Sequence, residues 1–521
     1  MEGNAASNIL KILIIILIVT VVVAVVLMAI MLIFGVSMFG MRFVSIGGKM
    51  SNAPDAKQSV TLSSEGWANA ETIDITTKGW NVELRPFSNA DDKEYQSSEK
   101  GVKILYYAQY SGFVKGEVDA KLKPIVYGRN SVGEQALLIE TLEPESVWIS
   151  RASTKVVVLY DEGVLANKKV RIHTDGGAVY LGSTSTQYFR GVLSDVGITS
   201  KSGKITVGNI DIINSLDISK DKGDLYFNTD ITGNLNLSIN SGFGTVELQR
   251  VGDPNKNSGI SVNLGKIQNS NITFDTIYGD LQYIQGNSGL IRGKLVTGSL
   301  IVNETQACVM KISNINRNVT FNSTAGSLYV GDIGGNLKSV MKGNGSINVK
   351  TIKGVSTIEA LNGLVALGLD FDNKTSATGV RGDVDIKSDG GDIKVKCSDE
   401  LSNGVLLKIR AKNSYVELSN IIGRVDYSML DNGKSRIKAN YKSLRGQSSL
   451  ETHNGTIDVQ IAQNSKAALK WSTGNRVNIE VSGCRSDEHS SDSFVDINGA
   501  SHEQINLITL TSESGKITVK N

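Results

Sequence analysis

Ser202-Gly203-Lys204-Ile205-Thr206-Val207 returns unchanged as Ser514-Gly515-Lys516-Ile517-Thr518-Val519, two residues before the end of the chain. Between these copies, a looser pattern of glycine, any residue, apolar residue, any residue, apolar residue keeps recurring. Clear copies begin at Gly223, Gly244, Gly279, Gly298, Gly326, Gly345 and Gly391. Apolar residues two positions apart lie on the same face of an extended strand, so each copy predicts a short strand with two inward side chains.

The spacing of these glycines predicts how the strands are arranged. Many neighbouring copies begin 19 to 21 residues apart, as do Gly203 and Gly223, or Gly326 and Gly345. A period near 20 is typical of solenoids, in which one rung cannot bury its own apolar face and must stack on others. The leading glycine is expected at a turn with positive φ. We therefore predict an all-β fold and a β-solenoid with two short strands per rung, with a sandwich of β-hairpins as the alternative.

The composition excludes some classes of partner. The chain has 521 residues, 54 glycines and only 5 prolines, which suits many tight turns between strands. Its net charge is +2, and basic and acidic residues are interleaved, so we expect no nucleic acid partner. Cys308, Cys397 and Cys484 are far apart and form no metal-binding motif, so isolated thiols are expected, with one disulfide left open.

Residues 9–41 are predicted to form a membrane-spanning helix. The run from Ile12 to Phe34 is apolar except for Thr20, and its 23 residues exceed the ~20 needed to cross a bilayer. We expect an uncleaved signal anchor, with residues 1–8 as a short cytoplasmic tail and residues 12–34 in contact with the lipid bilayer. Cleavage as a signal peptide, after a small residue such as Ser37, is the alternative. The flanking charges do not decide the orientation.

The rest of the chain divides by its pattern. Residues 42–66 are predicted as a linker, residues 67–165 as a membrane-proximal β-rich region without the period, and residues 166–521 as the β-solenoid. The β-rich region is expected to cover the first rung, because the edge of a stacked sheet needs protection. It contains Trp67, Trp80 and Trp148, for which core packing is favoured over a glycan-stacking surface.

One part of the chain resembles a known family. The strand Val156-Val157-Val158-Leu159, the run from Val170 to Leu181 and the run from Ser200 to Ile210 are similar to the repeating unit of the adhesin-like family of bacterial β-strand-repeat envelope proteins. The resemblance covers residues 155–209 and continues more weakly over residues 70–521. It implies a single-stranded right-handed β-helix outside the cytoplasm, an association of relatives with membrane-stress signalling, and no catalytic residues. The chain departs from the family in its length and in its N-terminal anchor.

The sequence names no catalytic, cofactor or metal site. Four carboxylates, Asp383, Asp385, Asp389 and Asp392, form the densest acidic group. They could bind Ca²⁺, but outward polar positions of alternating strands are the favoured interpretation. The tripeptide Arg381-Gly382-Asp383 is interpreted as the ordinary turn of the repeat. His502-Glu503 begins like a zinc-protease helix, but the second histidine is missing.

Three functions remain after this search. The favoured one is a non-enzymatic, extracytoplasmic scaffold or adhesin-like binding module, anchored in the cytoplasmic membrane by a single pass. It would contact a glycan or protein partner along the solenoid by multivalent binding. The alternatives are an ectodomain that senses envelope stress through a membrane partner, and a carbohydrate-active β-helix enzyme. The last would need acidic or basic side chains that converge in one groove, and the sequence does not say which rungs align.

Overall fold

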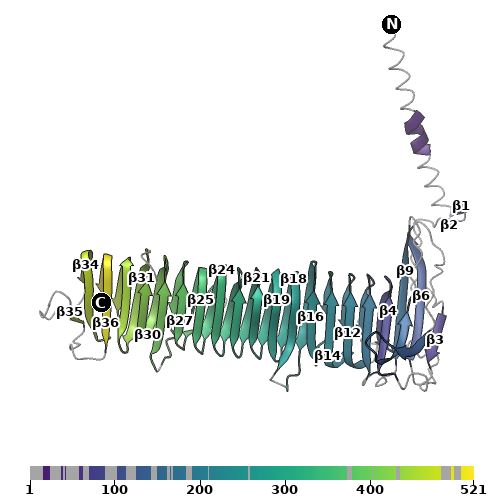
Figure 1. Ribbon diagram of the computed structural model, residues 1–521, viewed down its shortest axis with the longest axis horizontal. Helices are drawn as coiled ribbons and strands as arrows, with labels where there is room; N and C mark the ends of the chain where they lie inside the picture. Colours follow the sequence, from purple (N-terminus) through teal and green to yellow (C-terminus); the bar gives the residue numbers. More distant parts are fainter. Residues whose placement is uncertain are drawn as a thin grey trace, which may run out of the picture. The chain divides into compact units, whose positions relative to one another are not determined.

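The computed structural model confirms that the chain is all-β. It describes residues 16–23, 37–38, 41–42, 58–62, 70–87, 102–112, 125–141, 150–160, 165, 168–182, 191–208, 210–255, 259–371, 378–401, 403–429, 434–482, 494–497 and 506–521. Apart from a helix over residues 16–23, the described elements are strands (Figure 1). They form two compact units, Met1–Leu193 with Thr199–Ile210, and Ser194–Ile198 with Asp211–Asn521.

The first unit contains β1 (Ser37–Met38), β2 (Met41–Arg42), β3 (Gln58–Leu62), β4 (Thr72–Thr77), β5 (Asn81–Pro86), β6 (Val102–Gly112), β7 (Val126–Arg129), β8 (Gln135–Glu140), β9 (Ser150–Tyr160), β10 (Lys169–Thr174), β11 (Val179–Gly182) and β13 (Ile205–Gly208). Strand β12 (Gly191–Ser200) contributes to both units. The predicted boundary between residues 165 and 166 therefore falls inside this unit, between β9 and β10.

The second unit continues with β14 (Ile210–Lys220), β15 (Leu225–Phe227), β16 (Asn234–Ile239), β17 (Gly244–Val251), β18 (Ile260–Ile277), β19 (Asp280–Val296), β20 (Leu300–Thr305), β21 (Cys308–Ile315), β22 (Val319–Ser323), β23 (Ser327–Ile333), β24 (Leu337–Ile352) and β25 (Ser356–Leu367). It ends with β26 (Gly379–Val380), β27 (Val384–Ser388), β28 (Ile393–Lys396), β29 (Val405–Ala411), β30 (Tyr415–Met429), β31 (Arg436–Leu444), β32 (Ser448–Asn454), β33 (Thr456–Ile461), β34 (Ala467–Ser482), β35 (Phe494–Ile497) and β36 (Leu507–Lys520).

The period of the sequence is the register of a parallel ladder in the second unit. Leu281 pairs with Leu300, Leu300 with Val319 and Val319 with Leu337, so partners lie 18 or 19 residues apart. We call the residues of one such step a rung. A rung holds two strands, as in β20–β21 and β22–β23, or one long bent strand, as in β18, β19 and β24. Figure 1 shows these strands in a row in the second unit.

The core of the ladder consists of inward side chains stacked in columns. Leu281, Leu300, Val319 and Leu337 form one such column and are each at most 1% exposed. Burying a side chain of this size contributes about 2 kcal/mol. A single rung has no partner for these faces, so the stabilisation depends on the rungs above and below.

The glycines of the repeat have two different physical reasons. Gly203 and Gly515 adopt φ of +106° and +139°, as predicted for turns that only glycine enters easily. Gly345 is not among the described residues with positive φ. A Cβ there would instead lie 2.2 Å from the carbonyl oxygen of Gly326 in the preceding rung. The prediction of positive φ at every leading glycine is therefore wrong, because some glycines allow close approach of two backbones.

The last strand of the chain does not lie at the edge of the second unit. Strand β36 pairs in parallel with β32 and β33 on one side and with β34 on the other. Strand β34, which precedes β36 in the chain, is in turn covered by antiparallel β35 over residues 467–470. The repeat copy at Gly515 is therefore an interior rung, although it ends the sequence.

The first unit also places a rung out of chain order. Strands β4 and β5 pair in parallel with β8 and β9 on one side and with β10 and β11 on the other. Antiparallel β7 covers β8, antiparallel β6 covers β9, and β3 pairs with β6. Residues 67–165 thus supply whole rungs of the ladder as well as covering strands. Trp80 is fully buried, as predicted, whereas Trp67 and Trp148 lie outside the described residues.

The predicted membrane segment is only partly described. Residues 16–23 are helical and exposed, and most of the remaining residues of 9–41 lie outside the described part. Ser37–Met38 pairs antiparallel with Met41–Arg42, so the predicted helix end at residue 41 is too late. Within the described residues, the helix is too short to cross a membrane by itself.

Candidate binding groove

The four aspartates singled out by the sequence do not form a metal site. Asp383 accepts a hydrogen bond from the backbone N–H of Leu406 at 2.8 Å, and Asp385 forms an ion pair with Arg410 at 2.7 Å. Both contacts join one rung to the next. Among the described residues there is no group of three or more histidine, cysteine or acidic side chains that could hold a metal ion. Arg381 of the Arg-Gly-Asp tripeptide is paired with Glu400 at 2.5 Å.

The described cysteines are buried thiols. Cys308 and Cys397 are free, and burial raises the pKa of each to about 12. A thiol that stays protonated at neutral pH is a poor nucleophile and metal ligand. Cys484 lies outside the described residues.

One corner of the rungs forms a groove along the second unit. At this corner a column of inward residues runs through successive rungs, and we call it and its flanking outward residues the corner groove. The column consists of Ile267, Gly286, Thr305, Ser323, Met341, Ala360 and Ser388. Neighbouring rungs are about 4.8 Å apart, so the seven rungs extend over about 30 Å.

The first cavity of the corner groove is rich in side-chain amides. It has a volume of about 250 Å³ and is lined by Lys266, Gln268, Gln285, Gly286, Asn287, Glu304, Thr305, Gln306 and Thr324. The lining repeats every 19 residues, because Gln268, Asn287 and Gln306 take the same place in three rungs. Amides both donate and accept hydrogen bonds.

Gly286 lets the chain bend inward in this first cavity. A Cβ at this position would lie 1.5 Å from the hydroxyl oxygen of Tyr283, which is buried beneath it. The Tyr283 hydroxyl donates to the carbonyl oxygen of Ile267 at 3.5 Å. One rung further, the Thr305 hydroxyl donates to the Ser323 hydroxyl at 3.0 Å. Small side chains with internal hydrogen bonds thus form the floor, and longer polar side chains form the walls.

The second cavity lies on the same column and has an apolar floor. Its volume is about 340 Å³, and it is lined by Val340, Met341, Lys342, Glu359, Ala360, Leu361, Lys387 and Asp389. Glu359 and Lys387 are neighbours in the ladder and form an ion pair at 2.8 Å. This contact lowers the pKa of Glu359 and raises that of Lys387, so both groups are charged at neutral pH.

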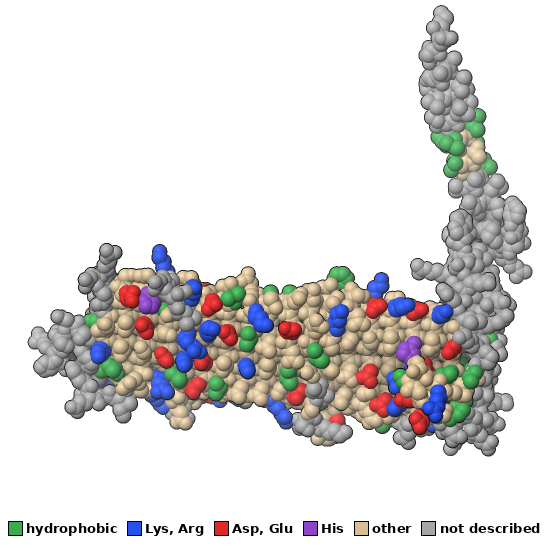
Figure 2. All heavy atoms as spheres, in the orientation of Figure 1, with side chains coloured by type: hydrophobic (Ala, Val, Ile, Leu, Met, Phe, Trp, Pro, Cys, Tyr) green, Lys and Arg blue, Asp and Glu red, His purple; other side chains and the backbone are tan. Residues whose placement is uncertain are grey.

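The formal charges on the walls of the corner groove balance. The first cavity has one basic and one acidic side chain, Lys266 and Glu304, and the second has two of each. Figure 2 likewise shows basic and acidic side chains interspersed over the visible face of the second unit. A groove of this kind offers hydrogen bonds and apolar contact without a strong field of one sign.

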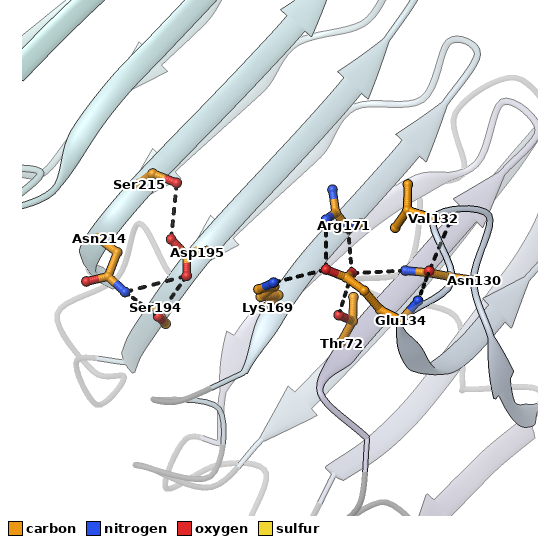
Figure 3. A network of polar contacts seen from close by, with 10 residues as sticks. All are labelled: Thr72, Asn130, Val132, Glu134, Lys169, Arg171, Ser194, Asp195, Asn214 and Ser215. Carbon is orange, nitrogen blue, oxygen red and sulfur yellow. Dashed lines mark hydrogen bonds and ion pairs between the residues drawn. The ribbon is translucent and has the colours of Figure 1, made fainter.

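The densest polar network of the first unit is structural. Figure 3 shows Glu134 at its centre, where the carboxylate accepts hydrogen bonds from Thr72, Asn130, Lys169 and Arg171 at 2.9 to 3.3 Å. These bonds, that from Arg171 above all, lower the pKa of Glu134 to about 2. A carboxylate so fully occupied has no free lone pair directed at a ligand. It joins the β7–β8 hairpin to β4 and β10.

A second network in Figure 3 belongs to the second unit. Asp195 accepts from Ser194 at 3.0 Å and from Ser215 at 3.2 Å, and Asn214 donates to Ser194 at 2.8 Å. Its members come from neighbouring strands and link one rung to the next. Like the Glu134 network, it has no cavity beside it among the described pockets.

Comparison with protein-family models, with curated proteins and with solved structures finds no match. The likeness to the adhesin-like family therefore stays a prediction from the sequence. The corner groove was missed at the sequence level, although its signal is present. Lys266, Gln285 and Glu304 also follow at intervals of 19 residues, so aligning the rungs by their glycines would have brought these polar side chains together.

Proposed function

We propose that the chain is a membrane-anchored β-solenoid that binds a neutral, extended glycan along the corner groove. The anchor is the apolar segment 12–34, and the two β units lie outside the cytoplasm. The protein acts as a scaffold or adhesin-like module and catalyses no reaction. The parallel ladder with its step of about 19 residues supports the solenoid architecture.

The observation that carries this proposal is that both cavities lie on one column of the ladder. A ligand that spans them must be long, because the corner groove extends over about 30 Å of stacked rungs. It must be polar but not highly charged, because the wall charges balance and side-chain amides line the first cavity. A polyhydroxylated neutral polymer fits these conditions, since each hydroxyl can donate to and accept from an amide. Weak contacts repeated along the rungs then add up by multivalency.

The enzyme alternative is less well supported by the groove. A glycosidase needs a carboxylic acid with a raised pKa beside a second carboxylate. Glu359 has the opposite shift, because Lys387 stabilises its ionised form. The envelope-sensor alternative has no observation of its own among the described residues.

The binding proposal is tested with the full chain in lipid nanodiscs and immobilised neutral polysaccharides, with an anionic polysaccharide for comparison. Gln285→Ala is expected to weaken binding about fivefold, which corresponds to one hydrogen bond of about 1 kcal/mol. Gln282→Ala is the matched control, because it removes the same side chain from the same strand outside the cavity. Equal effects of the two substitutions, or stronger binding of the anionic polymer, would contradict the proposal.

The orientation is tested by protease treatment of intact cells that carry a tag after Asn521. The tag is preferable to an antibody against the last strand, because β36 lies between two other strands. Loss of the tag without lysis is expected. Full protection until the cytoplasmic membrane is lysed would place the β units in the cytosol and exclude this function.

A further inference from the structure

Strand β36 fills a slot between two strands that precede it in the chain. Ser448 of β32 and Leu469 of β34 both pair with Ile508 of β36, one from each side. These two residues are 21 positions apart in the chain, which is the step of an ordinary rung. Tyr415 and Arg436, for example, are direct ladder partners at the same separation. The two sides of the slot therefore have the register of neighbouring rungs, and β36 is an additional rung inserted between them.

Every described contact that holds β36 is made with the walls of this slot. The hydroxyl of Thr452 donates to that of Ser512 at 3.3 Å, and both residues are 1% exposed. His453 and Glu513 lie 3.0 Å apart, and Lys516 pairs with Glu480 of β34 at 2.6 Å. Inward Leu510 and Ile517 continue the columns of the core. None of these contacts requires β36 to belong to the same chain as the slot.

The covalent connection to β36 is long enough to reach another molecule. Strand β35 is held on β34, and nine residues, 498–506, join it to β36. Nine extended residues span about 30 Å, several times the distance between two rungs. The other end of β36 is the end of the chain, so the strand can enter a slot without threading any loop.

We propose that the slot between β32–β33 and β34 also takes the β36 of a second copy, so that two copies exchange their last strands. Exchange replaces each contact by an identical one, so the two states differ mainly in chain entropy. The slot exists only when β34 is complete, and β36 is the last segment to be synthesised. A neighbouring copy can therefore supply the strand before the chain's own strand arrives. This inference is independent of the glycan-binding proposal.

The test is a disulfide that can form between two chains only after exchange. Two differently tagged full-length chains are co-expressed in a Cys484→Ser background, one with Thr452→Cys and the other with Ser512→Cys. The two positions are ladder partners, and cysteines at such a distance can be joined. After mild oxidation, a covalent heterodimer is expected that disappears on reduction.

The matched control uses Thr305→Cys in one chain and Ser323→Cys in the other. This hydroxyl pair is also buried and also joins ladder partners, but it lies in an interior part of the ladder whose rungs follow chain order. The heterodimer from the slot pair is expected to be at least tenfold more abundant than that from the control pair. Equal amounts from both pairs, or none from the slot pair, would overturn the proposal.

A further variant ensures that a negative result is meaningful. Thr452→Cys and Ser512→Cys in a single chain must form an intrachain disulfide, which is detected by faster migration without reductant. If this pair does not close, Asn454→Cys with Ser514→Cys replaces it, because these residues are ladder partners in the same slot. A pair that closes within one chain but never between chains would show that β36 stays in its own molecule.

Discussion

In the first unit, the rung β4–β5 precedes both of its neighbours in the chain, whereas in the second unit β36 follows both of its neighbours. Each rung is interior in its unit, and each lies beside a rung that carries antiparallel strands. The difference is in the tethers. The chain continues from β4–β5 in both directions, to β3 and to β6, whereas β36 has one tether and a free end.

This difference teaches how the same topology can be locked or left exchangeable. The β4–β5 rung is further held by the Glu134 network, which involves Thr72 of β4 and two residues of β10. Strand β36 is held by ladder hydrogen bonds, inward side chains and two more exposed ion pairs. The first rung cannot leave without unfolding its neighbours, but the last strand can leave by itself.

The largest expected effect comes from ending the chain after Asn506, which removes β36 alone. The inward side chains of Leu510, Ile517 and Val519 are then lost, and at about 2 kcal/mol each the local stability falls by roughly 6 kcal/mol. Amide hydrogens of β32 and β34 are expected to exchange faster in hydrogen-exchange mass spectrometry, and those of β4 to be unchanged. Removing Asn521 alone is the control. Unchanged exchange in β32 and β34 would mean that β34 takes the place of β36 without cost.

A pair of glycine substitutions compares the two rungs next. Gly515→Ala places a Cβ 2.0 Å from the carbonyl oxygen of Gly455 at a φ of +139°, and is expected to cost about 3 kcal/mol. Gly79→Ala, in the turn between β4 and β5, has a φ of +76° but nothing within 4 Å, and is expected to cost about 1 kcal/mol. Chemical denaturation measures both. Similar losses would show that backbone conformation, and not the close approach of rungs, determines the cost.

A buried lysine in the second unit allows a stabilising substitution. Lys220 occupies the place before the turn that Thr174 occupies in the first unit, three residues before a glycine in both cases. The Thr174 hydroxyl accepts a hydrogen bond from the N–H of Gly177 at 3.1 Å, whereas the Lys220 ammonium donates to the carbonyl oxygen of Asp224 at 3.2 Å. Lys220 is 1% exposed, and burial lowers its pKa to about 8.

Lys220→Thr is therefore expected to stabilise the protein by about 2 kcal/mol at pH 7. The folded state binds the proton more weakly than the unfolded state, so the wild type gains stability as the pH rises above about 8. The advantage of the variant should shrink over the same range. Thermal unfolding at pH 7 and at pH 10 measures both, and a difference that does not depend on pH would contradict the assignment.

The smallest expected effect concerns the Glu134 network. Its carboxylate has a pKa of about 2, below the ordinary value, so its contribution is complete above the unfolded pKa and is lost as the pH falls from about 4.5 toward 2. Glu134→Gln is expected to cost about 1 kcal/mol at pH 7, because solvent screens part of the interaction. Glu513→Gln, at the more exposed contact of β36, should cost less. A loss at Glu513 equal to that at Glu134 would remove the contrast between the two rungs.

Several features of the fold could be predicted before the structure. The alternation in Gly326-Ser327-Leu328-Tyr329-Val330 predicted a strand with two inward side chains, and Leu328 and Val330 are fully buried. The step of about 20 residues predicted the register, and residues 370–378 were recognised as an insertion, which lengthens the step between Ser356 and Val384 to 28. These features depend on local pattern and spacing, which a single sequence contains.

The position of a rung in the stack could not be predicted in the same way. An inward-outward pattern is the same wherever a rung lies, so the identical motifs at Ser202 and Ser514 say nothing about their neighbours. The carboxylates Asp383 and Asp385 looked like a cluster in the sequence, but their partners Leu406 and Arg410 come from the next rung. The corner groove needed the same alignment between rungs before its side chains came together.

The sequence by itself determined that the chain is all-β, that its strands are short and that they repeat with a step near 20, because strand alternation and turn glycines are local properties of the backbone. The tertiary structure alone decided that the last strand is an interior rung and that polar residues 19 apart line one groove. Parallel pairing is made between backbones, which are the same in every rung, so order and alignment are settled only when the rungs stack.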